Sequence, residues 1–249
     1  MMRRLIPDAT DDVDLEACYA VPAELPWHVR TSFISSADGA VSLDGRAGGL
    51  GSAGDRRVFA LLRDLSDVIL VGAGTARAEG YGAPRPVGPR LERRRRHGLP
   101  DAPVLALVSQ RLSFEPDSAL FPDDLPRTLV ITSGTSPPER RSDLARHAEV
   151  LVCGEDTVDL VAAAAALRDR GLRRVHCEGG PRLFAGALGA GLVDELCLTV
   201  APLLTGPGSG RIVTGLELPV PAGLDLAHVL EEDGYLFLRY QVLPAPPVS

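Results

Sequence analysis

The feature that most constrains the fold is an alternation of short, β-branched apolar segments with amphipathic segments. Strand-like patterns cover residues 67–71, 103–108, 127–132, 149–153 and 173–177. Apolar residues recur at helical spacing over residues 55–65, 137–146, 156–170 and 181–190. Alternation of this kind is typical of an α/β protein with a largely parallel sheet covered by helices.

The pattern changes toward both ends of the chain. Residues 27–34 form a first predicted strand, and after residue 190 only strand patterns remain, at 193–200, 224–231 and 235–242. We therefore expect a mixed sheet, mostly parallel, that finishes with antiparallel C-terminal strands. The chain of 249 residues, 45% of them hydrophobic, can bury one large core. The predicted organisation is an N-terminal lead-in at 1–26, a single domain at 27–243 and a flexible tail at 244–249.

Charge and composition exclude several classes of protein. A net charge of −7 argues against a nucleic-acid partner, which requires a basic face. The four cysteines stand singly, with no pair at metal-ligand spacing, so we expect reduced thiols and no metal site. The acidic segment 8–16 replaces the apolar run of a signal peptide, and no apolar run reaches bilayer length. We expect a cytoplasmic protein without a membrane partner.

Two glycine-rich turns follow predicted strands, at residues 70–77 and 177–183. Glycines let the backbone approach a ligand closely, and the free N–H groups at a helix N-terminus stabilise an anion. Pro181 suits the first helical position, where its missing N–H costs nothing. Either turn alone could be only a tight connection between strand and helix. Two such turns on one sheet predict binding of a nucleotide diphosphate.

The sequence does not match several other known nucleotide-binding and catalytic motifs. The first turn lacks the third glycine of a dinucleotide-binding fingerprint, because that position is Arg77, and no Walker-type Lys-Ser or Lys-Thr follows any glycine pair. His147 and His176 each begin an H-x-E tripeptide, but no P-C-x-x-C follows, which excludes a zinc deaminase. The scattered histidines give no support to a hydrolase triad. The Pro/Arg-rich segment 83–100, with its basic run 93–96, is interpreted as a solvated surface loop.

Four motifs occur in a fixed order. They are Ser36-x-Asp38-Gly39, Phe59-x-Leu61-Leu62-Arg63, Val71-Gly72-x-Gly74-Thr75-x-Arg77-x-Glu79 and Glu178-Gly179-Gly180-Pro181-x-Leu183. Over residues 28–242 the chain resembles the pyrimidine reductase domain of bacterial riboflavin biosynthesis, which has the three-layer dihydrofolate-reductase-like fold. The resemblance implies an oxidoreductase that uses NADPH on a small molecule similar to 5-amino-6-(5-phosphoribosylamino)uracil. Hydride transfer to ribosyl C1′, in its open imine form, would give a ribityl product.

The resemblance also implies site residues. The matched cofactor contacts are Thr75, Glu79, Gly179, Gly180, Pro181, Arg182 and Leu183. Ser109 and Arg111 follow the strand that ends at Val108, where this fold would place a 2′-phosphate, and a hydroxyl with a guanidinium would favour NADPH over NADH.

Ser36, Arg63 and Arg85 are the expected substrate-binding residues, with Arg85 one position out of the family register. Glu178 and Asp38 are the expected catalytic positions, and Glu178 matches a substrate contact. A closed cleft would raise the pKa of Asp38 and let its carboxyl donate a proton. Alternatively, Asp38 only bonds its own backbone in the turn before Gly39.

Two other functions stay open. The chain could reduce a related pterin, folate or specialised pyrimidine, or it could bind NADPH without turnover, since hydride transfer requires neither a metal nor a triad. A homodimer is expected from the resemblance alone. Its candidate interface strands are 193–200 and 236–242.

Overall fold

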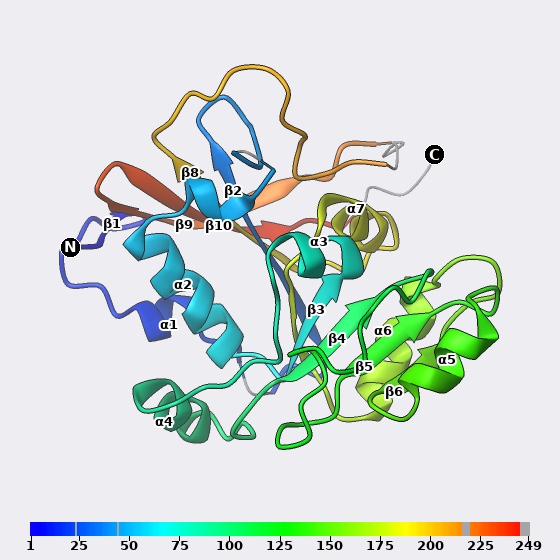
Figure 1. Cartoon of the computed structure of the whole chain (residues 1–249). Coiled ribbons are helices and arrows are strands. Elements are labelled where there is room, and N and C mark those ends of the chain that lie inside the picture. The colour runs from blue at the N-terminus through cyan, green and yellow to red at the C-terminus, as the bar shows by residue number, and fades with distance from the viewer. Residues whose placement is uncertain (23, 44, 216–219, 245–249) are drawn as a thin grey trace.

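The computed structural model describes residues 1–22, 24–43, 45–215 and 220–244. Its strands form one ten-stranded sheet in the order β1-β9-β10-β8-β2-β7-β3-β4-β5-β6 (Figure 1). The strands are β1 (Arg3–Ile6), β2 (His28–Ser36), β3 (Val68–Gly72), β4 (Val104–Val108), β5 (Leu129–Thr132), β6 (Glu149–Val152), β7 (Arg174–Cys177), β8 (Glu195–Ala201), β9 (Leu224–Glu232) and β10 (Tyr235–Val242). The helices are α1 (Leu15–Tyr19), a 3₁₀ turn (Ala47–Leu50), α2 (Ala53–Asp64), α3 (Ala73–Ala78), α4 (Pro89–Arg96), α5 (Pro138–Leu144), α6 (Leu160–Asp169) and α7 (Pro181–Gly189).

The sheet is parallel over most of its width, and this confirms the predicted fold class. β2 pairs in parallel with β7 and β8, and the parallel pairing continues through β3, β4, β5 and β6. Antiparallel pairing begins where β10 meets β8 and continues to β9 and β1. The carboxyl ends of β2, β3 and β7 consequently lie at one edge of the sheet, where ligands bind in open α/β folds.

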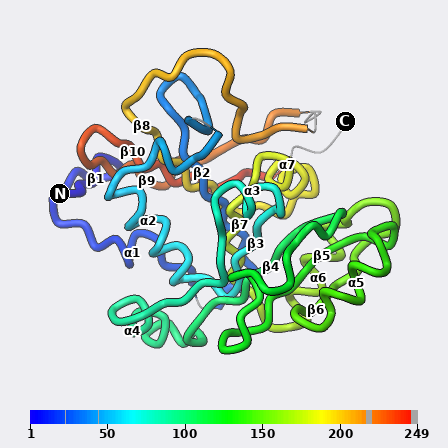
Figure 2. Tube along the Cα trace, viewed as in Figure 1, coloured from blue at the N-terminus to red at the C-terminus, as the bar shows by residue number. Residues whose placement is uncertain are grey.

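Helices cover both faces of the sheet, which gives three layers (Figure 2). Alternation along β3 sends Val71 toward the cluster that includes residues of α3 and α5, and sends Val68 toward α6. Along β8, Cys197 packs with α1 and α2 on one face, whereas Leu196 packs with α7 on the other. The core therefore lies on both sides of the central strands.

The N-terminal segment, expected as a lead-in, contributes to this sheet. β1 pairs with β9, with Arg3 opposite Glu231, and the side chains of Met2 and Tyr19 are buried against α2 and β10. β1 alone is too short to signal a strand in the sequence, and its partner lies more than 200 residues away. Of the expected flexible tail, 244–249, all but Pro244 lies outside the described residues.

The interpretation of the basic run as a solvated loop is wrong. Residues 89–96 form α4, and the Arg94 side chain is fully buried. Its guanidinium donates to the backbone carbonyls of Pro100, Arg63, Asp64 and Ser66 at 2.7 to 3.2 Å. It thus satisfies carbonyls at the end of α2 that a helix leaves without partners, although burial lowers its pKa to about 10.

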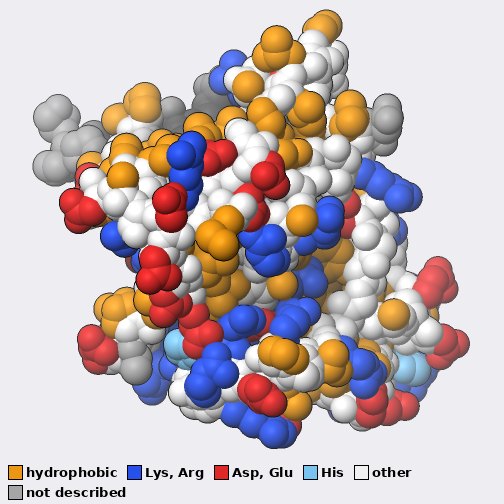
Figure 3. All heavy atoms as spheres, turned by 90° about the vertical axis from the view of Figure 1, so that its left-hand side faces the viewer, with side chains coloured by type: hydrophobic (Ala, Val, Ile, Leu, Met, Phe, Trp, Pro, Cys, Tyr) orange, Lys and Arg blue, Asp and Glu red, His pale blue; other side chains and the backbone are white. Residues whose placement is uncertain are grey.

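The other arginines of α4 bind acidic side chains. Arg90 and Arg93 bind Asp64 of α2, and Arg93 and Arg96 also bind Glu16 of α1. Basic and acidic groups are interleaved over this part of the surface (Figure 3). The run therefore joins three helices and does not form a basic patch. No helix within the described ranges is both long and apolar enough to cross a bilayer.

Candidate active site

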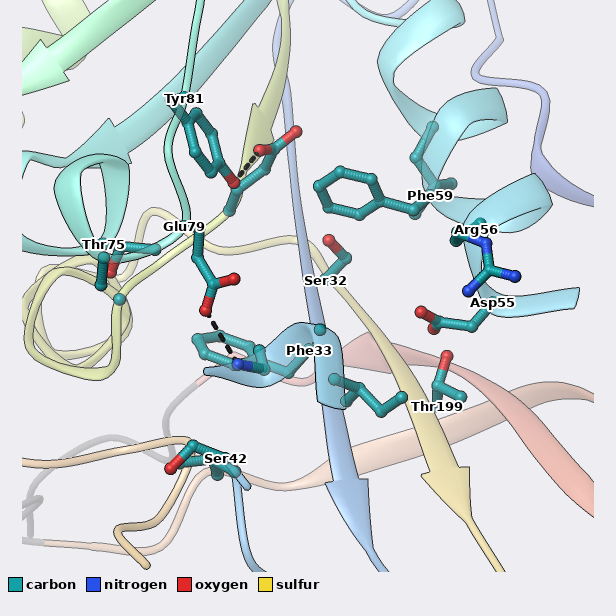
Figure 4. Close-up of a pocket in the computed structure, with 18 of the residues that line it drawn as sticks. Ser32, Phe33, Ser42, Asp55, Arg56, Phe59, Thr75, Glu79, Tyr81 and Thr199 are labelled. Carbon is teal, nitrogen blue, oxygen red and sulfur yellow. Dashed lines mark hydrogen bonds between the residues drawn. The ribbon is translucent and has the colours of Figure 1, made fainter. Parts of the chain in front are cut away.

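A cavity of about 700 Å³ opens at the carboxyl edge of the central strands. One wall is α2, another is α3 with the segment that follows it, and the turn between β7 and α7 closes a third side (Figure 4). β2 and β8 form the floor through Ser32, Phe33 and Thr199. The loop that carries Val41, Ser42 and Ala47 also lines the cavity, so segments from six parts of the chain meet there.

The turn before α7 forms the first end of the cavity, which Gly180, Pro181 and Thr75 line. Gly179 has φ +72°, and a Cβ there would lie 2.7 Å from Cζ of Phe33. A Cβ on Gly180 would collide with the Thr75 hydroxyl. The backbone can therefore follow this path only with glycines, and it brings the N-terminus of α7 to the cavity. The glycines and the N-terminus of α7 suit an anionic group, and the cofactor diphosphate expected there stays a prediction.

Glu79 connects two walls of the cavity. Its carboxylate accepts a 2.8 Å hydrogen bond from the backbone N–H of Ala47 in the 3₁₀ turn, as Figure 4 shows. Both residues line the cavity. The carboxylate thus fixes the loop before α2 against the end of α3, while it faces the space where the expected cofactor would lie.

The buried Glu178 carboxylate and the partly exposed Arg63 guanidinium form an ion pair in the middle of the cavity. Arg63 Nε lies 2.6 Å from Oε1 and Arg63 Nη2 lies 2.7 Å from Oε2. Tyr81 donates its hydroxyl hydrogen to Oε2, and the guanidinium lies 4.5 Å from the Phe59 ring centroid and 5.1 Å from that of Tyr81. Burial works against ionisation, but Arg63 and Tyr81 together lower the pKa of Glu178. Glu178 is thus a carboxylate acceptor at neutral pH.

His176 lies behind this pair on β7. One ring nitrogen, Nε2, is 2.8 Å from the Ser32 hydroxyl oxygen, and Nδ1 is 3.3 Å from Oε1 of Glu178. Burial lowers the pKa of His176 to about 4. The imidazole is therefore neutral at physiological pH and connects the Glu178 carboxylate to the β2 floor.

Ser36 and Asp38 lie outside the lining of this cavity. The Ser36 hydroxyl donates to Asp38, whose carboxylate also accepts from the backbone N–H groups of Thr205 and Gly206 at 3.1 and 2.9 Å. These bonds lower the pKa of Asp38 to about 2, so the expectation of a raised pKa is wrong. The carboxylate instead holds the turn after β2 against the loop at 202–210. The alternative, that Asp38 only bonds its own backbone, leaves out the bonds to Thr205 and Gly206.

Arg85 is also outside the cavity lining. Its guanidinium binds both carboxylate oxygens of Asp124 at 2.6 and 2.8 Å, and both side chains are exposed. The structure therefore does not bring Arg85 together with Arg63.

Ser109 and Arg111 lie on the turn after β4, and Arg182 and Leu183 lie on the first turn of α7. The Ser109 hydroxyl accepts from the backbone N–H of Leu112 at 3.0 Å, which shapes the turn after β4, and Arg111 is exposed on that turn. Arg182 is exposed on the first turn of α7, whereas Leu183 packs into the core beside Gly72. Neither pair lines the cavity formed by the described residues.

Sequence reasoning missed several residues of the cavity. Asp55, Phe59 and Thr199 line it, as does Tyr81. Phe59 belongs to a recognised motif and Tyr81 lies two residues after another, so a partner for Arg63 could have been sought there. Nothing in the sequence pairs Asp55 with Thr199, which lies 144 positions further along the chain.

The sheet, its two helical layers and the glycine-lined cleft define a class of protein, the α/β nucleotide-cofactor proteins of the dihydrofolate-reductase-like fold. The model of the RibD C-terminal domain family matches residues 27–234. The chain belongs to this family.

Relatives and solved structures agree with this assignment. The chain is 35% identical to the 2,5-diamino-6-ribosylamino-4(3H)-pyrimidinone 5′-phosphate reductase of Methanothermobacter thermautotrophicus, over 65% of this chain and 71% of that protein. It is 32% identical to the Archaeoglobus fulgidus protein of the same name, over 72% and 82%. The crystal structure of a pyrimidine reductase-like protein from Corynebacterium diphtheriae superposes with a TM-score of 0.83 at 31% identity, covering 94% of this chain and all of that one.

Proposed function

We propose that this chain is an NADPH-dependent reductase of a ribosylamino-pyrimidine 5′-phosphate, either 5-amino-6-(5-phosphoribosylamino)uracil or its 2-amino counterpart. One observation supports it above the others: a single cavity joins the glycine cradle at α7 to the Glu178–Arg63 pair. Two relatives are named as reductases of such a compound, and this supports reduction as the reaction in the cavity.

In the proposed reaction the open-chain imine at ribosyl C1′ gains a hydride on carbon and a proton on nitrogen, while NADPH becomes NADP⁺. NADPH supplies the hydride when bound. The residues of this chain bind and orient both molecules and exclude water, and such positioning removes most of the barrier in reactions of this type.

Each wall has a distinct role in this proposal. Gly180, Pro181 and Thr75 hold the cofactor diphosphate at the N-terminus of α7, and Glu79 with Ala47 encloses the adjoining part of the cofactor. The Glu178 carboxylate accepts a hydrogen bond from the substrate, because its lowered pKa keeps it ionised.

The remaining residues have supporting roles. Arg63 holds Glu178 in place, and Asp38 positions the loop that carries Val41 and Ser42 on the cavity wall. Arg111 and Ser109 meet the 2′-phosphate at the turn after β4 and provide the preference for NADPH over NADH. The protein works in the cytoplasm.

The experiment that tests this function has two stages. Fluorescence titration with NADPH and NADH measures binding, and the absorbance of reduced nicotinamide is then followed after addition of each pyrimidine substrate. Tighter NADPH binding with substrate-dependent oxidation supports the proposal. Binding without oxidation of any candidate substrate points instead to a nucleotide-binding protein without turnover, and failure to bind either cofactor contradicts the proposal.

A homodimer remains a prediction. β8 and β10 both have hydrogen-bonded neighbours on each side, so a second copy would have to contact their faces or the chain beyond them. Light scattering of the purified protein measures the assembly directly.

A further inference from the structure

Asp55 lies at the far end of the cavity from the glycine cradle. It is in the first turn of α2, where the Ser52 hydroxyl caps its backbone N–H at 3.1 Å. Its carboxyl faces the Thr199 side chain of β8, and Figure 4 shows both groups on the side opposite Thr75 and Glu79. The carboxyl therefore lies where a molecule placed beyond the cofactor would end.

The environment of this carboxyl differs from that of the other acidic groups buried in the described parts of the chain. Each of them forms an ion pair with arginine: Asp64, Glu178, Glu195 and Glu232. Asp55 has no ion pair among the described residues. The neighbouring Arg56 also lines the cavity and favours the ionised form of Asp55, but it is exposed and forms no ion pair with it. A half-buried carboxyl with one hydroxyl partner has unused acceptor capacity.

The wall between Asp55 and the Glu178–Arg63 pair is apolar. Val58, Phe59 and Leu62 of α2 line this stretch of the cavity. Such a surface accepts a flat heterocyclic ring, and a ring placed there would direct one polar edge at Asp55.

We infer that Asp55 selects a 2-amino-4(3H)-pyrimidinone ring over a uracil ring, and this inference rests on the function proposed above. A 2-amino-4(3H)-pyrimidinone presents N3–H and the 2-amino group side by side, and these two donors match the two oxygens of a carboxylate. A uracil presents a carbonyl oxygen beside N3–H, which would face a carboxylate oxygen with no hydrogen between them.

Protonation of Asp55 agrees with this role. Burial raises its pKa, while the Thr199 hydroxyl and Arg56 act in the opposite direction. Two ligand donors stabilise the ionised form, because hydrogen bonds to a carboxylate favour its charge. The 2-amino ring would thus supply hydrogen-bond donors to the Asp55 carboxylate that the chain itself does not provide. The preferred substrate would be the pyrimidine that still carries its 2-amino group.

The test compares kcat/KM for 2,5-diamino-6-ribosylamino-4(3H)-pyrimidinone 5′-phosphate and for 5-amino-6-(5-phosphoribosylamino)uracil on one enzyme preparation. The ratio does not depend on the folded fraction, since both substrates meet the same active molecules. Wild-type protein should favour the 2-amino substrate by about tenfold or more, as expected where a buried polar group is left unpaired with the other substrate.

Asp55→Asn supplies one acceptor and one donor, which match the N3–H and carbonyl of uracil. This variant should lower the ratio by about tenfold or more. The matched control is Asp101→Asn, which removes an exposed carboxylate that pairs with Arg95 on α4, outside the cavity; its ratio should equal that of the wild type.

Three results would overturn the inference. Equal use of both rings by the wild type, or an unchanged ratio in Asp55→Asn, removes the assigned role of Asp55 and leaves the proposed reductase intact. Absence of NADPH oxidation with either substrate contradicts the reductase itself, and the selectivity falls with it.

Discussion

Arg63 binds both carboxylate oxygens of Glu178, at 2.6 and 2.7 Å, between the rings of Phe59 and Tyr81. The arginine comes from α2 on one side of the cavity, and the glutamate follows β7 at the edge of the sheet. The pair therefore fixes the distance between two walls and also keeps a negative charge in the cavity.

Removal of that charge is the first test. Glu178→Gln should lower kcat/KM for the pyrimidine by about tenfold or more and should lower the free energy of unfolding by about 3 kcal/mol, because the partly buried guanidinium loses its counter-charge. The affinity for NADPH should change little. Steady-state kinetics, cofactor titration and urea unfolding measure the three quantities.

Glu149→Gln is the matched control for this variant. Glu149 pairs with Arg170 at the surface, so its loss should cost less than about 1 kcal/mol and leave kcat/KM unchanged. Equal effects of the two substitutions would show that Glu178 has no special place in the site.

The cofactor cradle makes a second prediction. In Gly180→Ala the added methyl group collides with Thr75, so affinity for NADPH should fall by about tenfold or more, as expected for a displaced phosphate contact. Gly210→Ala is the control, because its nearest neighbour would be Cγ2 of Val41 at an ordinary 3.8 Å. Fluorescence titration of both variants measures the change, and unaltered affinity in Gly180→Ala would place the cofactor elsewhere.

A third prediction distinguishes a positioning role of Asp38 from a role as a proton donor. Its pKa of about 2 means that the carboxyl does not titrate near neutral pH. Asp38→Ala should loosen the turn held to Thr205 and Gly206, lowering kcat/KM by less than about tenfold, without moving either limb of the pH–rate profile. If the pH–rate profile of this variant lost one limb, Asp38 would be a proton donor and the positioning role would be wrong.

Acid should destabilise the fold from pH 6.5 downward. Burial lowers the pKa of His228 and of His176 to about 4, so between pH 6.5 and 4 the unfolded chain binds protons that the folded chain does not. Stability is then present at higher pH and is lost as pH falls through this window. Urea unfolding against pH should show His228→Gln with a slope lower by about one proton than that of the wild type. An identical slope would show that His228 binds its proton in the folded state.

Elements with a strong periodic signal were predictable from sequence. The strand–helix alternation predicted the parallel sheet. The glycines at 179 and 180 marked the strand end where the cavity opens, because a Cβ at either position would collide with Phe33 or Thr75. α6 begins at Leu160 and not at the expected residue 156, since the Asp159 side chain caps it.

Features that depend on distant partners were not predictable. Arg94 looks like one of four equivalent surface arginines, and only the end of α2 makes it a buried donor. Asp38 and Arg85 have side chains suited to catalysis and phosphate binding, but Thr205 and Asp124 occupy them. Asp55 has no sequence signal, because its partner lies on β8.

Transfer of a labelled hydride tests the central claim most directly. The protein is given NADPH that carries deuterium on the transferred position of nicotinamide C4, together with the 2-amino ribosylamino-pyrimidine phosphate, and the product is analysed by mass spectrometry and NMR. The expected product carries one deuterium, located at C1′ of a ribityl side chain. Product without deuterium at C1′, or deuterium on the pyrimidine ring, would contradict it.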